Sequence, residues 1–395
     1  MQANASLPRT IFEPEHDQFR ESARRFFQTE IAPHGERWRK QGFVDREAFK
    51  KAGDQGYLMI WADEKYGGAN IKDFRFEQIL IEENGHHGEG GFFMSLHSRL
   101  VGSYLDHLCT EEQKMRFLPK CIKGETILGI AMTEPGTGSD LASMKTRAED
   151  KGDHWLMNGS KTYISNGQIG DLFVVAAKTD PNVSHGLGLF LVERGMEGFE
   201  RGRNLEKLGL KSQDTSELFF SNVKIPKANL LGDPVKGFRY LTHFLAEERL
   251  MSACGAIAHA QKAFDITLEF IKERKVFGKT LGLFQNSRFK MAEMRAHIDA
   301  LQCFVDQLVV MHNDGKLDVV SAAKAKMLTT DLENRVMDEC LQLHGGAGYM
   351  DEYPISRMFA NARISRIFAG SNEIMKEIIG RSLGLDDRQK SASRP

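Results

Sequence analysis

The 395-residue chain has few cysteines, almost no net charge and no long apolar run, and each absence excludes a class of protein. The formal net charge of −1 gives no electrostatic case for nucleic acid as a partner. The longest continuous apolar run, Leu172 to Ala177, has the length of a strand, so we expect no membrane-spanning segment. The five cysteines form no Cys-x-x-Cys pair and indicate reduced thiols rather than a disulfide framework: Cys109, Cys121, Cys254, Cys303 and Cys340.

Common nucleotide, metal and targeting motifs are also missing. The chain contains no P-loop motif and no Gly-x-Gly-x-x-Gly after a strand, which leaves nucleotide binding by either mechanism unsupported. Its 13 histidines include no His-Glu-x-x-His, so no metal site is expected. The first residues have neither an apolar signal core nor an Arg-rich, acid-poor pattern. They favour a cytoplasmic protein of bacterial type, with a mature mitochondrial matrix form as the alternative.

Hydrophobic periodicity divides the chain into three domains. A chain of this length is expected to have more than one domain, because a single hydrophobic core stops growing at about 250–300 residues. Residues 1–127 are predicted to be helical, residues 128–235 to form an antiparallel β domain, and residues 236–395 to form a helical bundle. The predicted strands lie between turn signals such as Asn158-Gly159, at 155–157, 162–165, 172–177, 187–192 and 217–223. The predicted helices are 14–32, 46–56, 74–86, 92–107, 111–122, 238–273, 285–313, 317–345 and 371–383. This is an α+β arrangement.

The stretch from 241 to 255 places a carboxylate on an apolar helix face. Glu248 falls in the middle of a stripe with spacings of three and four, formed by Leu241, Phe244, Leu245, Met251 and Gly255. A buried carboxylate is usually paired, protonated or functional. The stretch alone leaves two interpretations open: a functional group, or an edge residue paired with a neighbouring Arg or Lys.

Three glycine-containing segments could hold a ligand. Residues 133–140, TEPGTGSD, combine hydroxyls with glycines that let a backbone approach a ligand, although such a loop is more often a plain turn. Residues 342–349, QLHGGAGY, have more small residues than a helix C-cap needs. Residues 368–374, FAGSNEI, supply an N-cap at Ser371 or Asn372, and the helix start could also receive an anionic group.

Taken together, these segments resemble the two signatures of the acyl-CoA dehydrogenase family. AMTEPGTGSD at 131–140 is similar to the first signature, and QLHGGAGY with Asp351, Arg357 and Asn361 is similar to the second. The resemblance covers essentially the whole chain and includes YGG at 66–68, KTYISNG at 161–167, KLGLK at 207–211 and RKVFGK at 274–279. It implies an N-terminal helical domain, a middle β domain and a C-terminal four-helix bundle. It also implies one FAD per subunit, a homotetramer built as a dimer of dimers, and electron transfer flavoprotein as the oxidant.

The resemblance assigns flavin contacts by position. Residues expected to hold the flavin are Ile130, Met132, Thr133, Gly138, Ser139, Tyr163, Ile164, Ser165, Phe277, Ser371, Asn372 and Glu373. Residues expected to reach the adenine half of a neighbouring subunit's FAD are Arg274, Gln285, Gln342, Gly345 and Gly346.

The implied reaction is α,β-dehydrogenation of a fatty acyl-CoA to the trans-2-enoyl-CoA. A base removes an α-proton, the β-hydrogen passes to the flavin, and fixed donors stabilise the thioester oxygen. By position those donors include the backbone N–H of Ala369. Many family members carry the catalytic Glu at this position, which an Ala cannot replace. A minority, including long-chain and isovaleryl-CoA enzymes, place the base directly before an Arg on the first long C-terminal helix, and Glu248-Arg249 fits that pattern.

The family resemblance gives weaker guidance on the residues that contact the substrate and on the length of its acyl chain. The candidate substrate-side residues are Ser139, Ser184, His185, Arg239, Glu247, Arg249 and Gly370. His185 could equally be a loop histidine and Arg249 a structural ion-pair partner, and Arg239 replaces an aromatic residue of long-chain relatives. The small Gly102 and Ser103 are compatible with a deep acyl pocket, so long-chain acyl-CoA is favoured over branched short-chain acyl-CoA. An oxygen-using acyl-CoA oxidase, a DNA-associated flavoprotein and a purely structural helical protein are the remaining alternatives.

Overall fold

The computed structural model describes residues 6–183 and 185–385, which form two compact units. The helical unit comprises residues 6–21, 81–86 and 245–385, and the sheet unit comprises residues 22–80, 87–183 and 185–244. Each unit is described by itself below. None of the helices within the described ranges combines the length and apolarity that crossing a bilayer requires.

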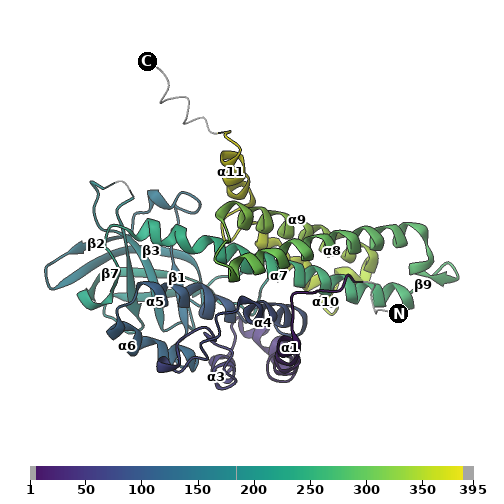
Figure 1. Cartoon of the computed structure of the whole chain (residues 1–395), viewed down its shortest axis with the longest axis horizontal. Coiled ribbons are helices and arrows are strands. Elements are labelled where there is room, and N and C mark those ends of the chain that lie inside the picture. The colour runs from purple at the N-terminus through teal and green to yellow at the C-terminus, as the bar shows by residue number, and fades with distance from the viewer. Residues whose placement is uncertain (1–5, 184, 386–395) are drawn as a thin grey trace, which may run out of the picture. The chain divides into compact units, whose positions relative to one another are not determined.

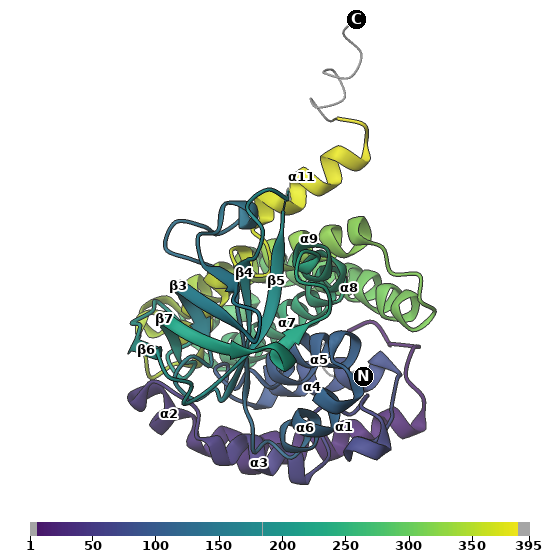
Figure 2. The ribbon, with the colours of Figure 1, turned by 90° about the vertical axis from the view of Figure 1, so that its left-hand side faces the viewer.

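The sheet unit is built on one mixed sheet with the strand order β6-β7-β3-β2-β4-β5-β8 and with β1 beside β4 (Figures 1 and 2). Most neighbouring strands are antiparallel, but β1 and β2 each pair with β4 in parallel. The predicted β domain is therefore confirmed, with a mixed rather than a purely antiparallel sheet. The strands are β1 (Leu128–Ala131), β2 (Arg147–Asp150), β3 (His154–Ser165), β4 (Leu172–Lys178), β5 (Leu187–Glu193), β6 (Phe199–Asn204), β7 (Thr215–Pro226) and β8 (Leu230–Leu231).

The core of this unit follows from two continuous apolar strands. All residues of β4 and β5 except the last of each are buried, which is the pattern of a strand covered on both faces. Phe173 and Val175 of β4 pack in one cluster with Phe190 of β5 and Trp155 of β3. Burial of side chains of this size stabilises a fold by about 1.5–3 kcal/mol each.

Strand β3 differs from the prediction because a turn signal lies inside it. Asn158-Gly159 was expected to separate two strands, and that prediction was wrong: β3 runs unbroken from His154 to Ser165. The register with β7 shifts between Met157 and Gly159, so the dipeptide forms a bulge. Gly159 has φ +146°, and a Cβ there would lie 2.6 Å from the Cα of Thr146. Glycine is required for this close approach rather than for a turn.

Most of the other secondary-structure elements in the described residues are helices. The helix α6 starts with a capping box, in which Thr110 and Gln113 satisfy each other's backbone N–H groups. Two predicted helices contain π-helical segments, at Phe27–Ile31 and Leu96–Val101. The helices before the sheet are α1 (Pro14–Phe26), α2 (Gly35–Gln41), α3 (Arg46–Asp54), α4 (Phe74–His87), α5 (Gly102–Leu108) and α6 (Glu111–Ile122).

Long helices α7 (Gly237–Glu273), α8 (Gln285–Asn313) and α9 (Val319–His344) confirm the predicted C-terminal bundle. In the helical unit they run side by side (Figures 1 and 2), and a short hairpin of β9 (Lys275–Val276) and β10 (Lys279–Thr280) connects α7 to α8. His259 of α7 contacts Glu333 of α9 at 2.8 Å. The shorter α10 (Pro354–Ala362) and α11 (Asn372–Ser382) follow, and both pack on α9.

Candidate active site

Glu248 lies on α7 in surroundings that disfavour its charged form. Its side chain is partly buried, and within the described residues its carboxylate makes no hydrogen bond or ion pair. Desolvation raises the pKa of Glu248 to about 7, against the opposing attraction of Arg249 and Lys326. A carboxyl group that titrates near neutral pH is suited to accept a proton from a weak carbon acid.

Arg249, the next residue, is a buried cation with few contacts. It is 3% exposed, and its Nε and Nη1 atoms have no hydrogen-bond partner among the described residues. Desolvation lowers its pKa, while the charge of Glu248 acts in the opposite direction. A Cβ added to Gly370 would lie 4.0 Å from its Nη2, so this guanidinium reaches the turn that precedes α11. The expectation of a structural ion pair has no hydrogen-bonded partner to support it.

The turn before α11 has an unusual backbone. Ala369 and Gly370 have φ values of +54° and +81°, so two consecutive residues are left-handed. No hydrogen bond is made by the N–H of Ala369 to any described residue, which leaves this donor available. Ser371 then caps α11 by accepting a hydrogen bond from the N–H of Ile374 at 3.5 Å.

A second buried cation, Lys326 of α9, lies behind this turn. Its Nζ donates to the carbonyl oxygen of Gly370 at 2.8 Å and to Oδ1 of Asn372 at 2.9 Å. Asn372 is 1% exposed and donates to Asp331 at 3.0 Å. Within the helical unit, Arg249 and Lys326 therefore both reach the Ala369–Gly370 turn, and the charges of both act on Glu248. Lys326 is not among the residues predicted from the sequence, although a Lys within an apolar helix segment is a signal of the same kind as Glu248.

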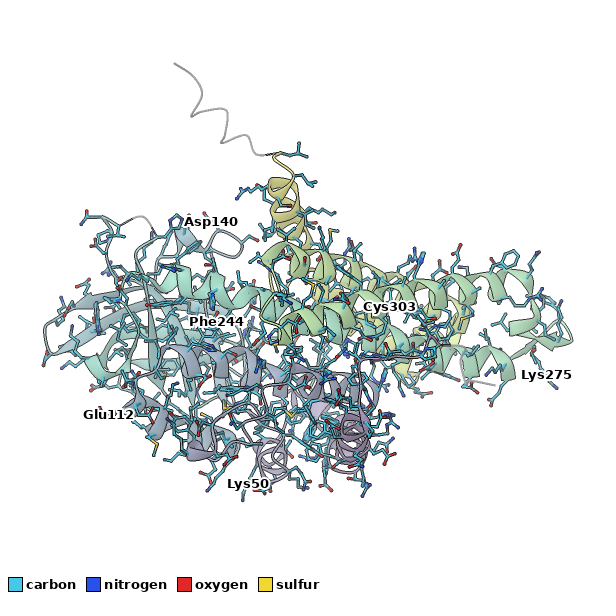
Figure 3. All side chains as sticks on the ribbon, in the orientation of Figure 1. Lys50, Glu112, Asp140, Phe244, Lys275 and Cys303 are labelled. Carbon is cyan, nitrogen blue, oxygen red and sulfur yellow. The ribbon has the colours of Figure 1, made fainter. Side chains whose placement is uncertain are left out.

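Within the sheet unit, the loop 133–139 is held by a buried carboxylate. Glu134 is 5% exposed and accepts hydrogen bonds from the backbone N–H groups of Lys145 at 2.6 Å and Thr146 at 2.9 Å. Its third partner is Nζ of Lys161, which is 0% exposed and 2.9 Å away. Burial lowers the pKa of Lys161 to about 8, and Glu134 opposes this effect. Gly138 has open space where a Cβ would lie, and Figure 3 labels Asp140 at the end of the loop.

Tyr163 stands beside this loop in strand β3. It has φ +59° at a register shift between Lys161 and Ile164, and its side chain is 69% exposed while Ile164 is buried. The N–H of Thr162 donates to the carbonyl of Thr133 at 2.9 Å, which joins the two segments. The loop residues and residues 163–165 are therefore brought together, as expected, and an exposed aromatic ring on a strained backbone offers a flat apolar surface.

Other predicted flavin contacts are exposed in the helical unit. Phe277, at the tip of the β9–β10 hairpin, is 96% exposed with φ +49°, and Figure 3 labels its neighbour Lys275 at this end of the unit. Exposed residues of the helical unit among the remaining predictions are Arg274, Gln285, Gln342, Gly345, Gly346 and Glu373. These side chains and backbones are accessible to a ligand or to a second subunit.

The candidate substrate residues are distributed over both units. Glu247 binds His312 at 2.7 Å, so its carboxylate is engaged within the helical unit. His185 is exposed, with its ring 4.5 Å from that of Phe238, and Arg239 is exposed. Ser184 lies outside the described residues.

Gly102 has a packing role that differs from the pocket-lining role expected from the sequence. A Cβ there would come within 2.8 Å of the Trp61 ring and 3.1 Å of Met59 Cε. Ser103 donates its hydroxyl to the carbonyl of Arg99 at 2.6 Å. The small size of Gly102 is therefore explained by close packing on Trp61, and it is not in itself evidence for acyl-chain length.

Three comparisons with known proteins find the same family over nearly the whole chain. Family models described as "Acyl-CoA dehydrogenase" match with their N-terminal domain at residues 13–125, their middle domain at 129–223 and their C-terminal domain at 235–384. The long-chain specific acyl-CoA dehydrogenase of Mus musculus mitochondria is 46% identical over 381 residues, which is 96% of this chain and 88% of that protein. The isovaleryl-CoA dehydrogenase of Pongo abelii mitochondria is 34% identical and covers 94% of this chain and 89% of that protein. The crystal structure of an acyl-CoA dehydrogenase from Geobacillus kaustophilus superimposes with a TM-score of 0.93 at 45% identity, covering 94% of this chain and 98% of that one.

Proposed function

Because the chain belongs to the acyl-CoA dehydrogenase family, whose members are oxidoreductases, we propose that it oxidises long-chain fatty acyl-CoA to trans-2-enoyl-CoA. Electrons then pass to electron transfer flavoprotein, the partner expected across the family. The observation that carries the proposal is a carboxyl group with a pKa of about 7, at Glu248, in the same unit as an available backbone N–H at Ala369.

Glu248 and Ala369 have separate tasks in the proposed reaction. The carboxylate of Glu248 takes the α-proton of the thioester, and the electrons of that C–H bond move into the new C=C bond as the β-hydrogen departs. The N–H of Ala369 donates to the thioester oxygen, where negative charge develops, and a fixed donor of this kind is worth about 2.7–4 kcal/mol of barrier. Bound FAD supplies the acceptor for the β-hydrogen and its electron pair.

The residues proposed to hold FAD have suitable chemistry. In the sheet unit, the open glycine at Gly138, the hydroxyls of Thr133 and Ser139, and the exposed ring of Tyr163 combine polar donors with a stacking surface. We further propose that Ser371, Asn372 and Glu373 contact the flavin, and that exposed residues at 274–285 and 342–346 reach FAD of a neighbouring subunit.

We also propose a homotetramer. The helical unit exposes several large apolar side chains, and apolar surface of this kind can mark an interface with other subunits. They include Phe277, Leu283, Phe289, Tyr349 and Leu383, all at least 59% exposed. Sedimentation should give a mass near four chains, and a monomer at micromolar concentration would contradict this.

The decisive experiment is a chain-length series on wild type and Glu248→Gln. Stopped-flow flavin reduction should be fastest with long-chain acyl-CoA and should fall by at least about 10³-fold in Glu248→Gln, since general-base catalysis contributes up to about 10⁴. Glu269→Gln, an exposed carboxylate on the same helix that pairs with Lys272, serves as the matched control.

Other outcomes would redirect the proposal. Fastest reduction by isovaleryl-CoA would favour the branched short-chain alternative. Rapid reoxidation by oxygen, without electron transfer flavoprotein, would indicate an oxidase. Retained reduction in Glu248→Gln would remove Glu248 as the base.

A further inference from the structure

Lys326 has no role in the chemistry proposed above, yet its side chain is placed at considerable energetic cost. The residue is 0% exposed, and burial lowers the pKa of its ammonium group to about 8. A buried amine destabilises a fold unless its donors are hydrogen-bonded and its charge is compensated. Its surroundings therefore indicate what it does.

The donors of Lys326 are directed at one short segment. Its Nζ contacts the carbonyl of Gly370 at 2.8 Å and Oδ1 of Asn372 at 2.9 Å, on the two sides of Ser371. Asn372 is fixed in turn by Thr330 and Asp331, both at 3.0 Å. A single cation from α9 thereby anchors a turn that contains two left-handed residues, Ala369 and Gly370.

The charge of Lys326 acts on a second group. Four other ionisable groups face it from three helices: Glu248 and Arg249 of α7, Asp331 of α9 and Glu373 of α11. Asp331 is shared, because Arg366 also binds it at 2.7 Å. Among the described residues, the cations Arg249 and Lys326 act on Glu248, and both favour its ionised form. Removal of either cation should make the carboxylate harder to ionise.

We propose that Lys326 is a positioning residue that serves both halves of the reaction. Its hydrogen bonds hold the Ala369–Gly370 turn so that the N–H of Ala369 stays in one place, and its positive charge supports the ionised carboxylate of Glu248. This inference rests on the proposed function, since it assigns Lys326 to the site of that reaction.

Two variants separate the two roles. Lys326→Gln keeps an N–H donor but removes the charge, so the acid limb of the pH profile for flavin reduction should move upward by about one pH unit. Lys326→Arg keeps the charge but has a planar group that does not fit the same two acceptors. It should leave the acid limb in place and lower the plateau rate by about tenfold or more. Thr329→Val is the matched control, because the buried hydroxyl of Thr329 donates to the α9 carbonyls of Ala325 and Lys326, and it should change neither quantity.

An infrared titration tests the charge effect without catalysis. With ¹³C-labelled glutamate, the difference between wild type and Glu248→Gln isolates the carboxyl band of Glu248 in the flavin-loaded protein without acyl-CoA. Its titration midpoint should rise by about one pH unit in Lys326→Gln. An unchanged midpoint, or an unmoved acid limb in an active and folded Lys326→Gln protein, would overturn the proposal. If wild type fails to reduce its flavin with any acyl-CoA, the proposed function fails, and the infrared midpoint still decides whether Lys326 acts on Glu248.

Discussion

At the level of single residues, the helical unit holds a partly buried carboxyl group, Glu248, and a fully buried amine, Lys326. Burial raises the pKa of Glu248 to about 7 and lowers that of Lys326 to about 8, so each moves toward its neutral form. The two groups nevertheless attract each other, which limits both shifts. A site assembled in this way is balanced between ionised and neutral states near physiological pH.

Glu248 should reduce the stability of the protein at alkaline pH. Because its pKa in the folded state lies above the ordinary value of 4.5, folding favours the protonated form. The stabilising contribution of protonated Glu248 is therefore complete below about pH 4.5 and is lost as the pH rises through about 7. Glu248→Gln should be more stable than wild type by roughly 2 kcal/mol at pH 8 and about equal at pH 5, after allowance for partial solvent exposure. Urea unfolding at both pH values checks this, and a difference that does not depend on pH would contradict it.

The sequence pattern predicts Glu248 as a candidate base but does not point to Lys326. Both lie within apolar helix segments, where a carboxylate is more unusual than a Lys. A Lys commonly places its stem on apolar surface with its amine in water, so its position in the sequence carries less information. Whether such an amine is exposed or buried depends on acceptors that arrive from distant segments, here residues 370 and 372. Long-range contacts of this kind cannot be read from periodicity.

At the level of elements, the π-helical segment Leu96–Val101 carries a histidine that joins two parts of the sheet unit. His97 is fully buried, its Nδ1 accepts from the N–H of Leu128 at 3.1 Å, and its Nε2 donates to the carbonyl of Cys121 at 3.0 Å. These bonds require one neutral tautomer. Burial lowers the pKa of His97 to about 4, and the hydrogen bond to Cys121 opposes this effect.

His97 should therefore make the protein sensitive to acid. Because its pKa in the folded state lies below the ordinary 6.5, its contribution is full above pH 6.5 and is lost as the pH falls toward 4, by about 3 kcal/mol. His97→Gln does not titrate. It should be less stable than wild type at pH 7.5 and should lose most of that disadvantage by pH 4.5, as measured by denaturant unfolding. A constant gap would show that His97 does not titrate as described.

Lys161 should support FAD binding through the loop it holds. Lys161→Met leaves the buried carboxylate of Glu134 without its cation, and the loop 133–139 should then lose its fixed conformation. We expect FAD affinity to weaken by about tenfold or more in a fluorescence titration of apoprotein. Lys145→Met is the matched control, because Lys145 contributes only its backbone N–H to Glu134. Equal affinities for the two variants would contradict this role.

Sequence patterns predicted the elements better than their interruptions. The three long C-terminal helices begin and end within two residues of their predicted bounds, because long amphipathic periods leave little ambiguity. The Asn158-Gly159 turn signal failed because the local preference was overruled by pairing of β3 with β7 on both sides of the bulge. Strand β1, beside the candidate flavin loop, was missed because its four residues are too short to show alternation.

At the level of the whole molecule, stability should depend on the proposed ligand by mass action. A ligand that binds only the folded state stabilises it by about 2.7 kcal/mol at one hundred times its dissociation constant. Thermal unfolding of apoprotein should therefore shift upward progressively with added FAD, and riboflavin, which lacks the pyrophosphate and adenine, should have a smaller effect. An unfolding temperature that ignores FAD would contradict the cofactor assignment.

Tyr163, Phe277 and Ala369 share a left-handed backbone although none of them is glycine. Such a conformation costs on the order of 1 kcal/mol or more at each position and persists only where the surrounding structure enforces it. A backbone already bent in this way loses little freedom when a ligand arrives, so less of the contact energy is consumed in ordering the protein. Glycine would relieve the strain, and it is the residue that these positions lack. The backbone strain at these three positions therefore lowers the stability of the unliganded protein, and it leaves these surfaces preorganised for a ligand.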